Sequence, residues 1–256
     1  MTEAPVPRLT AQSIAGVIDS LGQIVAWSKD HASPLGYFAA LYRRVTVAVA
    51  GGIEDGRFED GPRMERLDVA FANRYLDAVE GYRAGREITR AWGFAFMALD
   101  RWSPVVLQHL MLGMSAHINL DLGIAAASTC GGQGPAALRH DFVAINDILN
   151  GLVDDVQRQL EGVWPLMRLI DLVAGRGDEL VAGVGMAVAR ERAWSLAETL
   201  AALPRDQWPA EIDRRDRAVA ALGGRLLRPR VLLRAVLLLI RLGERGSVAR
   251  VIERLE

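Results

Sequence analysis

Residues 105–126 read VVLQHLMLGMSAHINLDLGIAA, and this stretch decides the fold. Apolar side chains occur all round it, so a helical wheel drawn at about 100° per residue has no polar face. A helix of this kind is normally central and buried, and its polar side chains then need partners inside the protein. The sequence therefore predicts a core helix over Val105–Ala126 that carries polar groups.

The sequence on both sides of this helix repeats the apolar period of about 3.6 residues and lacks the alternation of strands. Helix starts are expected at Ser33-Pro34, Gly61-Pro62 and Ser103-Pro104, because proline in a first turn needs no N–H donor and serine can cap the exposed amides. The expected helices are Gln12–Ser28, Leu35–Ala50, Met64–Tyr82, Glu87–Leu99, Val105–Ala126, Ala136–Leu160, Asp178–Leu203 and Arg230–Leu242.

Glycine clusters separate these segments. None follows a strand pattern, so we interpret them as turns between helices and not as phosphate-binding loops. The clusters are Gly51-Gly52, Gly131-Gly132 with Gly134, Gly175 with Gly177, and Gly223-Gly224. We predict an all-α, single-domain array over residues 1–256, with roughly eight to ten helices around the buried central helix.

Composition and charge narrow the class of protein. Hydrophobic residues make up 51% and charged residues 24%, which is typical of a globular chain, and the net charge of −1 gives no electrostatic reason to expect a nucleic-acid partner. Met1–Thr10 lacks a signal-peptide pattern, and the apolar run in Val231–Leu242 is shorter than the roughly 20 residues of a membrane span. The single cysteine, Cys130, forms no disulfide framework. We therefore expect a cytoplasmic protein without a transmembrane segment.

The central helix places His117 and Asp121 four residues apart on one face, about 40° from each other. A buried carboxylate one turn from an imidazole needs a cation, a donor network or a metal ion. Two interpretations stay open. Asp121 accepts a hydrogen bond from His117 or pairs with a buried arginine, or the two residues are half of a metal site. His109 lies roughly 80° from His117 on the wheel, and Asn119 points to another side.

Acidic side chains on two other helices could complete such a site. Asp141 falls on the apolar stripe of Ala136–Leu160, where the alternative role is an N-cap, and Asn146 falls near its edge. Asp68 and Glu65 flank the stripe of Met64–Tyr82, where the alternative for Asp68 is a salt bridge with Arg74 or with an arginine from another helix. The predicted metal ligands are His117, Asp121, Asp141 and Asp68, with a second group of Glu65, His109, Asn119 and Asn146.

A less favoured pattern is the series Asn146, Asn150 and Asp154. This spacing of four is typical of the magnesium-binding triad of class I terpene cyclases, whose helical fold and apolar interior also agree. The aspartate-rich partner motif of those enzymes is missing upstream.

Four blocks of sequence carry a family resemblance. The main one is LGMSAHINLDLGIA at 112–125, supported by RMERLDVAFANRYLDA at 63–78, HDFVAINDIL at 140–149 and RERAWSLA at 190–197. In these blocks the chain resembles an uncharacterised family of bacterial all-helical proteins. Its members typically read glycine-x-asparagine-alanine-histidine-isoleucine-asparagine-x-aspartate-leucine in the first block. Ser115 departs from the usual asparagine. The resemblance implies importance for His117, Asn119, Asp121, Asp68, Asp141 and Asn146.

The leading functional hypothesis is a metal-dependent enzyme that acts on a small, largely apolar molecule, with zinc, iron or manganese held by the predicted ligands. Hydrolysis by a metal-activated water and oxidation at a non-haem iron both fit such a set, and the catalytic residues remain unassigned. The rival hypothesis is a non-catalytic helical binding or scaffold protein, in which the same side chains form a buried hydrogen-bond network.

The apolar C-terminal segment Arg228–Leu242 is expected to pack against protein, either within the chain or across a homodimer. A helix that lies on a membrane surface is the alternative.

Overall fold

The computed structural model describes residues 9–130, 134–145, 148, 185–244 and 246–256. Over these ranges the regular elements are helices and no strand is present, which confirms the all-α prediction. The α-helices are α1 (Ile14–Asp30), α2 (Leu35–Glu54), α3 (Gly61–Arg83), α4 (Arg90–Met97), α5 (Val106–Ala116), α6 (Leu122–Thr129), α10 (Met186–Ala202), α11 (Trp208–Leu227), α12 (Val231–Gly243) and α13 (Val248–Leu255). A π-helical turn, η1 (His117–Asp121), joins α5 to α6, and two 3₁₀ turns are η3 (Pro135–Leu138) and η4 (Arg205–Gln207).

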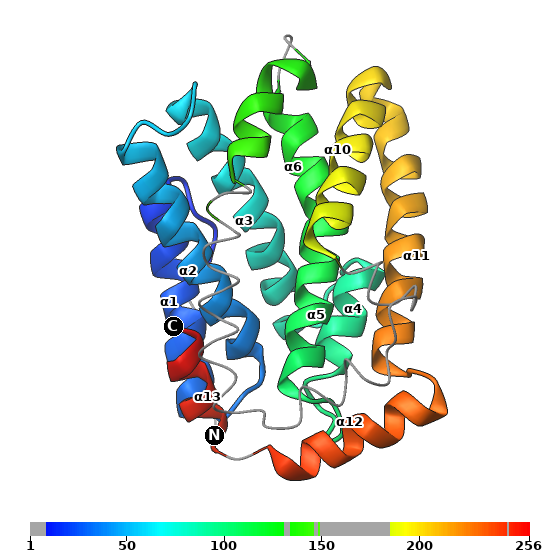
Figure 1. Cartoon of the computed structure of the whole chain (residues 1–256). Helices are drawn as coiled ribbons and strands as arrows, with labels where there is room; N and C mark the ends of the chain where they lie inside the picture. The colour runs from blue at the N-terminus through cyan, green and yellow to red at the C-terminus, as the bar shows by residue number, and fades with distance from the viewer. Residues whose placement is uncertain (1–8, 131–133, 146–147, 149–184, 245) are drawn as a thin grey trace.

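The central helix of the prediction is present, as α5, η1 and α6 in one continuous run, Val106–Thr129. Figure 1 shows it in the middle of the array, with α1 and α2 on one side, α10 and α11 on the other, and α12 across one end. By length and hydropathy this run could cross a membrane, but 83% of its most apolar window is buried inside the protein, as in a core helix. At Gly123 an added Cβ would lie 2.6 Å from the Ala193 carbonyl oxygen, so the backbone of α10 packs directly on α6.

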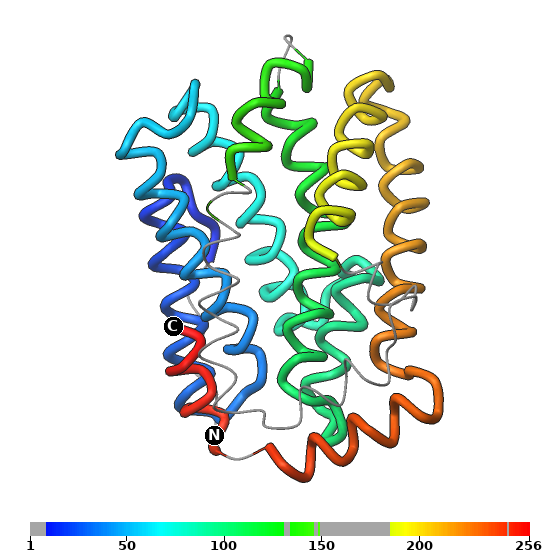
Figure 2. The backbone as a smooth tube through the Cα atoms, viewed as in Figure 1, coloured from blue at the N-terminus to red at the C-terminus, as the bar shows by residue number. Residues whose placement is uncertain are grey.

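Both ends of the described chain lie on the side of the array that α1 and α2 form (Figure 2). The helix α13 packs against both α1 and α2, as the tube in Figure 2 shows. Ile252 of α13 is fully buried, and its Cδ1 would lie 2.5 Å from a Cβ added at Gly36 of α2. The missing side chain at Gly36 therefore leaves the space that α13 fills.

Two of the predicted glycine turns are wrong. Gly51-Gly52 lies inside α2 and Gly223-Gly224 inside α11. A Cβ at Gly52 would be 2.9 Å from Ile148 Cδ1, and one at Gly223 would be 3.2 Å from Phe94 Cβ. These glycines therefore allow close packing between helices and do not end them. Gly131, Gly132, Gly175 and Gly177 lie outside the described residues.

Candidate functional site

The π-helical turn falls on the sequence HINLD, the centre of the block that carries the family resemblance. The Leu122 N–H donates to the His117 carbonyl, five residues back, where a regular α-helix would bond four residues back. Turns of this kind are rare and frequently mark functional sites. The wider turn was not predicted from the sequence, because the apolar pattern continues through it unchanged.

Asp121 is fully buried and accepts hydrogen bonds from three side chains. Its Oδ2 is 2.8 Å from Trp92 Nε1 and 3.2 Å from His117 Nδ1, and its Oδ1 is 3.1 Å from Arg74 Nε. The two partners that the sequence offered as alternatives, His117 and an arginine, are therefore both present, although the Arg74 side chain is 33% exposed and not buried. The carboxylate is satisfied by these donors and fixes α3, α4 and the π turn at one point.

His117 is held by Asp121 on one ring nitrogen only. A carboxylate is solely an acceptor, so we assign the Nδ1 proton to the bond with Asp121, which leaves Nε2 as a bare acceptor. Burial lowers the pKa of His117, and the bond and charge of Asp121 oppose this shift. The imidazole is therefore neutral near pH 7, and its buried Nε2 has no hydrogen-bond partner among the described residues.

Five aromatic rings surround the imidazole, and we call them the aromatic cage. Phe71 stacks on His117 with ring centroids 3.6 Å apart and an interplanar angle of 8°, and Tyr42 meets it edge-on at 4.6 Å. The remaining members are Phe38, Tyr75 and Trp92, whose ring centroids lie 5.7, 6.2 and 6.0 Å from that of His117. The cage draws on α2, α3 and α4, so only the folded chain brings it together.

Three further polar atoms near the cage are buried and have no hydrogen-bond partner within the described ranges: the hydroxyls of Tyr42 and Tyr75, and Asp68 Oδ2. Asp68 lies one helical turn before Phe71 on α3. Burial, with a smaller contribution from the charge of Glu65, raises the pKa of Asp68 to about 7. Burial also raises the pKa of Tyr42, helped by the charge of Asp68. Each buried polar atom without a partner costs about 1–3 kcal/mol, so this group calls for a partner that the described residues do not supply, such as a ligand or water.

The expected salt bridge between Asp68 and Arg74 is not formed, because Arg74 Nε donates to Asp121. Asp68 lacks that cation and stays in an apolar setting, which is the reason for its raised pKa.

Of the second group of predicted ligands, the structure describes Glu65, His109 and Asn119, and each of them makes other contacts. Glu65 Oε1 accepts from the Ile14 N–H at the start of α1, at 3.2 Å. Asn119 Nδ2 donates to the Ser115 carbonyl, also at 3.2 Å. His109 packs edge-on against Tyr37, and burial followed by the charge of Arg241 lowers the pKa of His109 to about 4. Asn146, with Asn150 and Asp154 of the terpene-cyclase pattern, lies outside the described residues.

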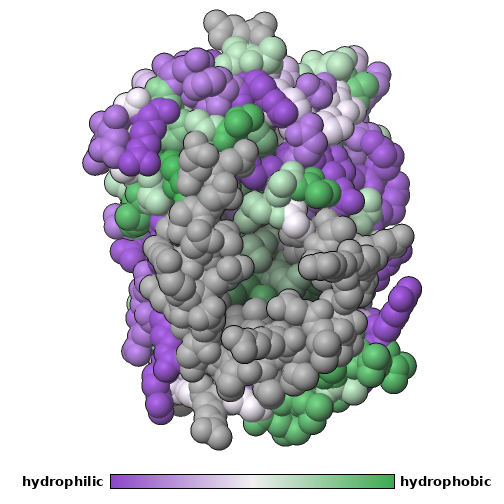
Figure 3. All heavy atoms as spheres, viewed as in Figure 1, coloured by the Kyte–Doolittle hydropathy of each residue, from purple (hydrophilic) through white to green (hydrophobic). Residues whose placement is uncertain are grey.

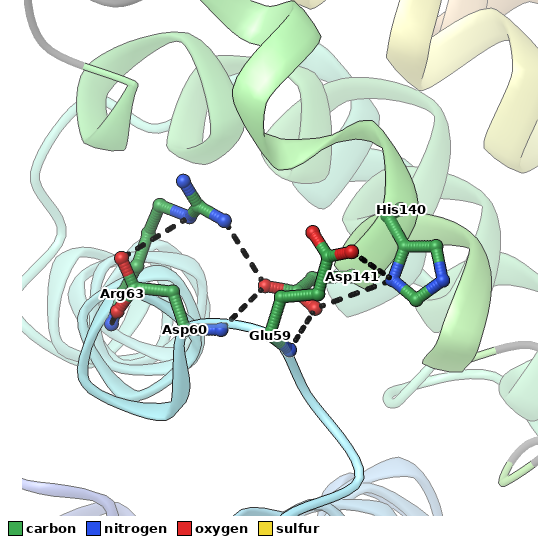
Figure 4. A network of polar contacts seen from close by, with 5 residues as sticks. All are labelled: Glu59, Asp60, Arg63, His140 and Asp141. Atoms are coloured by element: carbon green, nitrogen blue, oxygen red, sulfur yellow. Dashed lines mark hydrogen bonds and ion pairs between the residues drawn. The ribbon is translucent and has the colours of Figure 1, made fainter.

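Asp141 belongs to a different cluster, shown in Figure 4. Its carboxylate accepts from the backbone N–H groups of Glu59 and Asp60, at 2.7 and 3.2 Å, and from Arg63 Nη2 at 3.1 Å. It therefore fixes the start of α3 and does not cap its own helix. Asp141 therefore does not lie with His117 and Asp121, although the sequence predicted one common site.

Among the described residues, one group of three His or acidic side chains offers ligand atoms within 4.8 Å of one another: Glu59, His140 and Asp141. Glu59 and His140 are exposed, and the oxygens of Asp141 already accept three hydrogen bonds. The cluster is explained by the anchoring of α3, and we do not assign it a metal.

Replacing Asp141 with alanine should lower the free energy of unfolding by roughly 2–4 kcal/mol, because two backbone amides and a largely buried guanidinium lose their acceptor. Urea denaturation followed by circular dichroism measures this. Glu59→Ala, at an exposed side chain of the same cluster, should change stability by less than about 0.5 kcal/mol. Equal losses in the two variants would contradict the anchoring role.

Comparison with known proteins gives one match. A family model described as "Family of unknown function (DUF5995)" matches residues 14–229, a range that includes the π turn and all five rings of the aromatic cage. No curated protein and no solved structure matches the chain.

Proposed function

The chain belongs to DUF5995, a family of unknown function, and from the site we propose that it binds a small, largely apolar molecule in the aromatic cage and that His117 acts on this molecule as a general base. The observation that carries the proposal is the state of the imidazole. Asp121 holds Nδ1, while Nε2 is buried and finds no partner in the part of the chain that the structure describes. An imidazole oriented by a carboxylate, with its second nitrogen free, can accept a proton from a molecule placed against it.

Asp68 supplies the complementary group. With its pKa raised to about 7 by burial, a large share of its carboxyl groups is protonated near neutral pH and can donate a proton or a hydrogen bond. Two titratable groups whose surroundings keep one as a base and the other as an acid are typical of acid–base sites. We therefore assign His117 the role of base and Asp68 that of acid.

The cage defines the class of molecule. Its five rings favour an apolar or aromatic body, and the unpartnered hydroxyls of Tyr42 and Tyr75 favour a hydroxyl or carbonyl group on it. Figure 3 shows a hollow in the middle of this face of the molecule, floored by hydrophobic side chains, where Figure 1 shows the middle of the central helix. A small phenol or alcohol fits these features.

A metal-dependent form of this function, expected from the sequence, would use fewer of the predicted ligands. Asp121 does not fit as a direct ligand, because Trp92, His117 and Arg74 occupy its oxygens. It does fit as the carboxylate that orients a metal-binding histidine through the other ring nitrogen. Zinc, iron or manganese would then be held by His117 Nε2 and Asp68, and would supply a Lewis acid or an activated water.

Metal content decides between the two forms. The metal-dependent form predicts metal in the purified protein and a melting temperature that rises when zinc, iron or manganese is added to chelator-treated protein. His117→Ala should abolish both effects. If the purified wild-type protein contains no metal, and added metal does not raise the melting temperature of chelator-treated protein, the metal-free acid–base form is the one that remains.

The second candidate is a non-catalytic scaffold, and the fully satisfied Asp121 supports it. In that case Asp121 would hold three helices together, and water would complete the remaining hydrogen bonds. Ligand binding distinguishes it from the acid–base function, since a scaffold gains no stability from small molecules.

The variant His117→Asn tests the proposed function. Its side-chain amide can keep the hydrogen bond to Asp121, while the acceptor at Nε2 is lost. The probe is 4-nitrophenol, whose visible absorbance reports its ionisation, within a panel of small phenols and aromatic alcohols. Wild-type protein should melt at a higher temperature with the probe and should increase its phenolate absorbance, and His117→Asn should lose the absorbance change.

The matched control is His109→Asn, a second buried histidine on the same long helix that lies outside the cage. It should bind the probe as the wild type does. If no member of the panel raises the melting temperature of the wild type, or if the two variants behave alike, the proposed function is wrong.

A further inference from the structure

The helix α12 is apolar on two opposite sides. Its inner side, formed by Val236, Leu237 and Ile240, is buried and packs with Val105. On a wheel of about 100° per residue, the opposite side carries large apolar side chains within one sector of about 100°. These are Val231, Leu232, Leu239 and Leu242, with exposed fractions of 87%, 67%, 57% and 71%.

Trp102 extends this outer surface. It is 61% exposed, and its carbonyl accepts a hydrogen bond of 2.8 Å from Arg241 Nε of α12. Hydrophobic side chains lie along the lower edge of the molecule in Figure 3, where Figure 1 places α12. We call Trp102 and the four apolar residues of the outer side the α12 patch. Large exposed apolar patches usually mark an interaction site.

Arginines accompany the patch, and acidic residues are missing from this segment. From Arg225 to Gly243 the sequence holds five arginines and no acid. Arg225, Arg228, Arg230 and Arg234 are exposed, and none of the four forms an ion pair within the part of the chain that the structure describes. The next acid, Glu244, is already paired with Arg241 at 2.7 Å.

This charge decides between two partners for the patch. The sequence predicted packing against protein, either within the chain or across a homodimer. A two-fold interface through α12, however, would bring the same arginines of both copies near each other, with no acid on α12 to balance them. An anionic surface balances them directly. We infer that α12 lies flat on an anionic lipid surface, with the α12 patch in the boundary between head groups and acyl chains and the arginines at the phosphates. This inference does not rest on the proposed function.

Vesicle flotation of the full-length protein tests it. The protein should float with vesicles of phosphatidylcholine mixed with phosphatidylserine, should stay behind with phosphatidylcholine alone, and should be released by high salt. The triple variant Arg228→Gln, Arg230→Gln, Arg234→Gln should bind the mixed vesicles about a hundred-fold more weakly, at roughly five-fold for each arginine near the surface.

The apolar triple variant Leu232→Gln, Leu239→Gln, Leu242→Gln should also lose about ten-fold or more in vesicle binding, with an unchanged circular dichroism spectrum because all three side chains are exposed. The matched control replaces three exposed valines on other helical segments, Val47, Val143 and Val188, by glutamine and should bind like the wild type.

Failure to float with the mixed vesicles, or equal binding by both triple variants and the control, would overturn the inference. So would a wild-type dimer, seen by analytical ultracentrifugation, that the apolar triple variant turns into a monomer, because the partner would then be a second copy.

Discussion

Replacing Asp121 by alanine should lower the free energy of unfolding by about 3–5 kcal/mol, the largest loss expected for a single substitution in this protein. The substitution removes the acceptor of Trp92 Nε1 and His117 Nδ1, both buried, and leaves Arg74 without its carboxylate. It also removes the carboxylate that joins α3 and α4 to the π turn. Urea denaturation at neutral pH, followed by circular dichroism and tryptophan fluorescence, measures the loss.

Asp121→Asn is the control for this substitution. An amide of the same shape keeps one acceptor oxygen, which serves one or two of the three donors, but removes the negative charge. The loss should therefore fall between those of the wild type and Asp121→Ala. A loss below about 1 kcal/mol in Asp121→Ala would mean that the three hydrogen bonds to this carboxylate contribute little to stability.

The central helix and its polar pair could be predicted because the signals are local. A segment with apolar residues all round has to be buried, and a spacing of four places His117 beside Asp121 on any helix. That Asp121 could pair with an arginine also followed from burial. Which arginine it is did not, since Arg74 lies 47 residues away from Asp121 along the chain.

The aromatic cage could not be predicted from periodicity. Phe38, Tyr42 and Phe71 read as ordinary core positions of their own helices, and their convergence on His117 depends on how α2 and α3 pack. The same limit explains Asp141. Its place on an apolar stripe correctly indicated burial, but that burial is beside the start of α3 and not beside His117.

Two helices were missed for reasons that also concern packing. The C-terminal α13 has eight residues and begins at a serine cap, too short for a periodic signal to stand out. The α11 helix contains Gly223-Gly224, which reads as a break until the side chain of Phe94 is seen to need that space. Glycine has two uses, turns and close contact, and the sequence alone does not separate them.

Asp68 gives the clearest expectation for pH dependence. Its pKa rises from 3.8 to about 7 in the folded protein, so the folded state binds this proton more tightly than the unfolded chain does. Ionisation of Asp68 therefore opposes folding. Its cost to stability begins above about pH 4, grows as the pH rises to about 7 and is constant beyond that, at about 4 kcal/mol for a shift of this size.

Asp68→Asn should therefore be more stable than the wild type at pH 8, by up to about 4 kcal/mol, and about equal to it near pH 4, where both side chains are neutral. Urea denaturation at the two pH values measures the difference, with Asp55→Asn, at an exposed acid, as the control that should show almost none. If Asp68 is the acid of the proposed site, the more stable variant should also lose its response to 4-nitrophenol. Functional residues are often retained at such a cost in stability. A variant that is less stable than the wild type at pH 8 would show that the Asp68 carboxylate has a stabilising partner, and would remove it from the site.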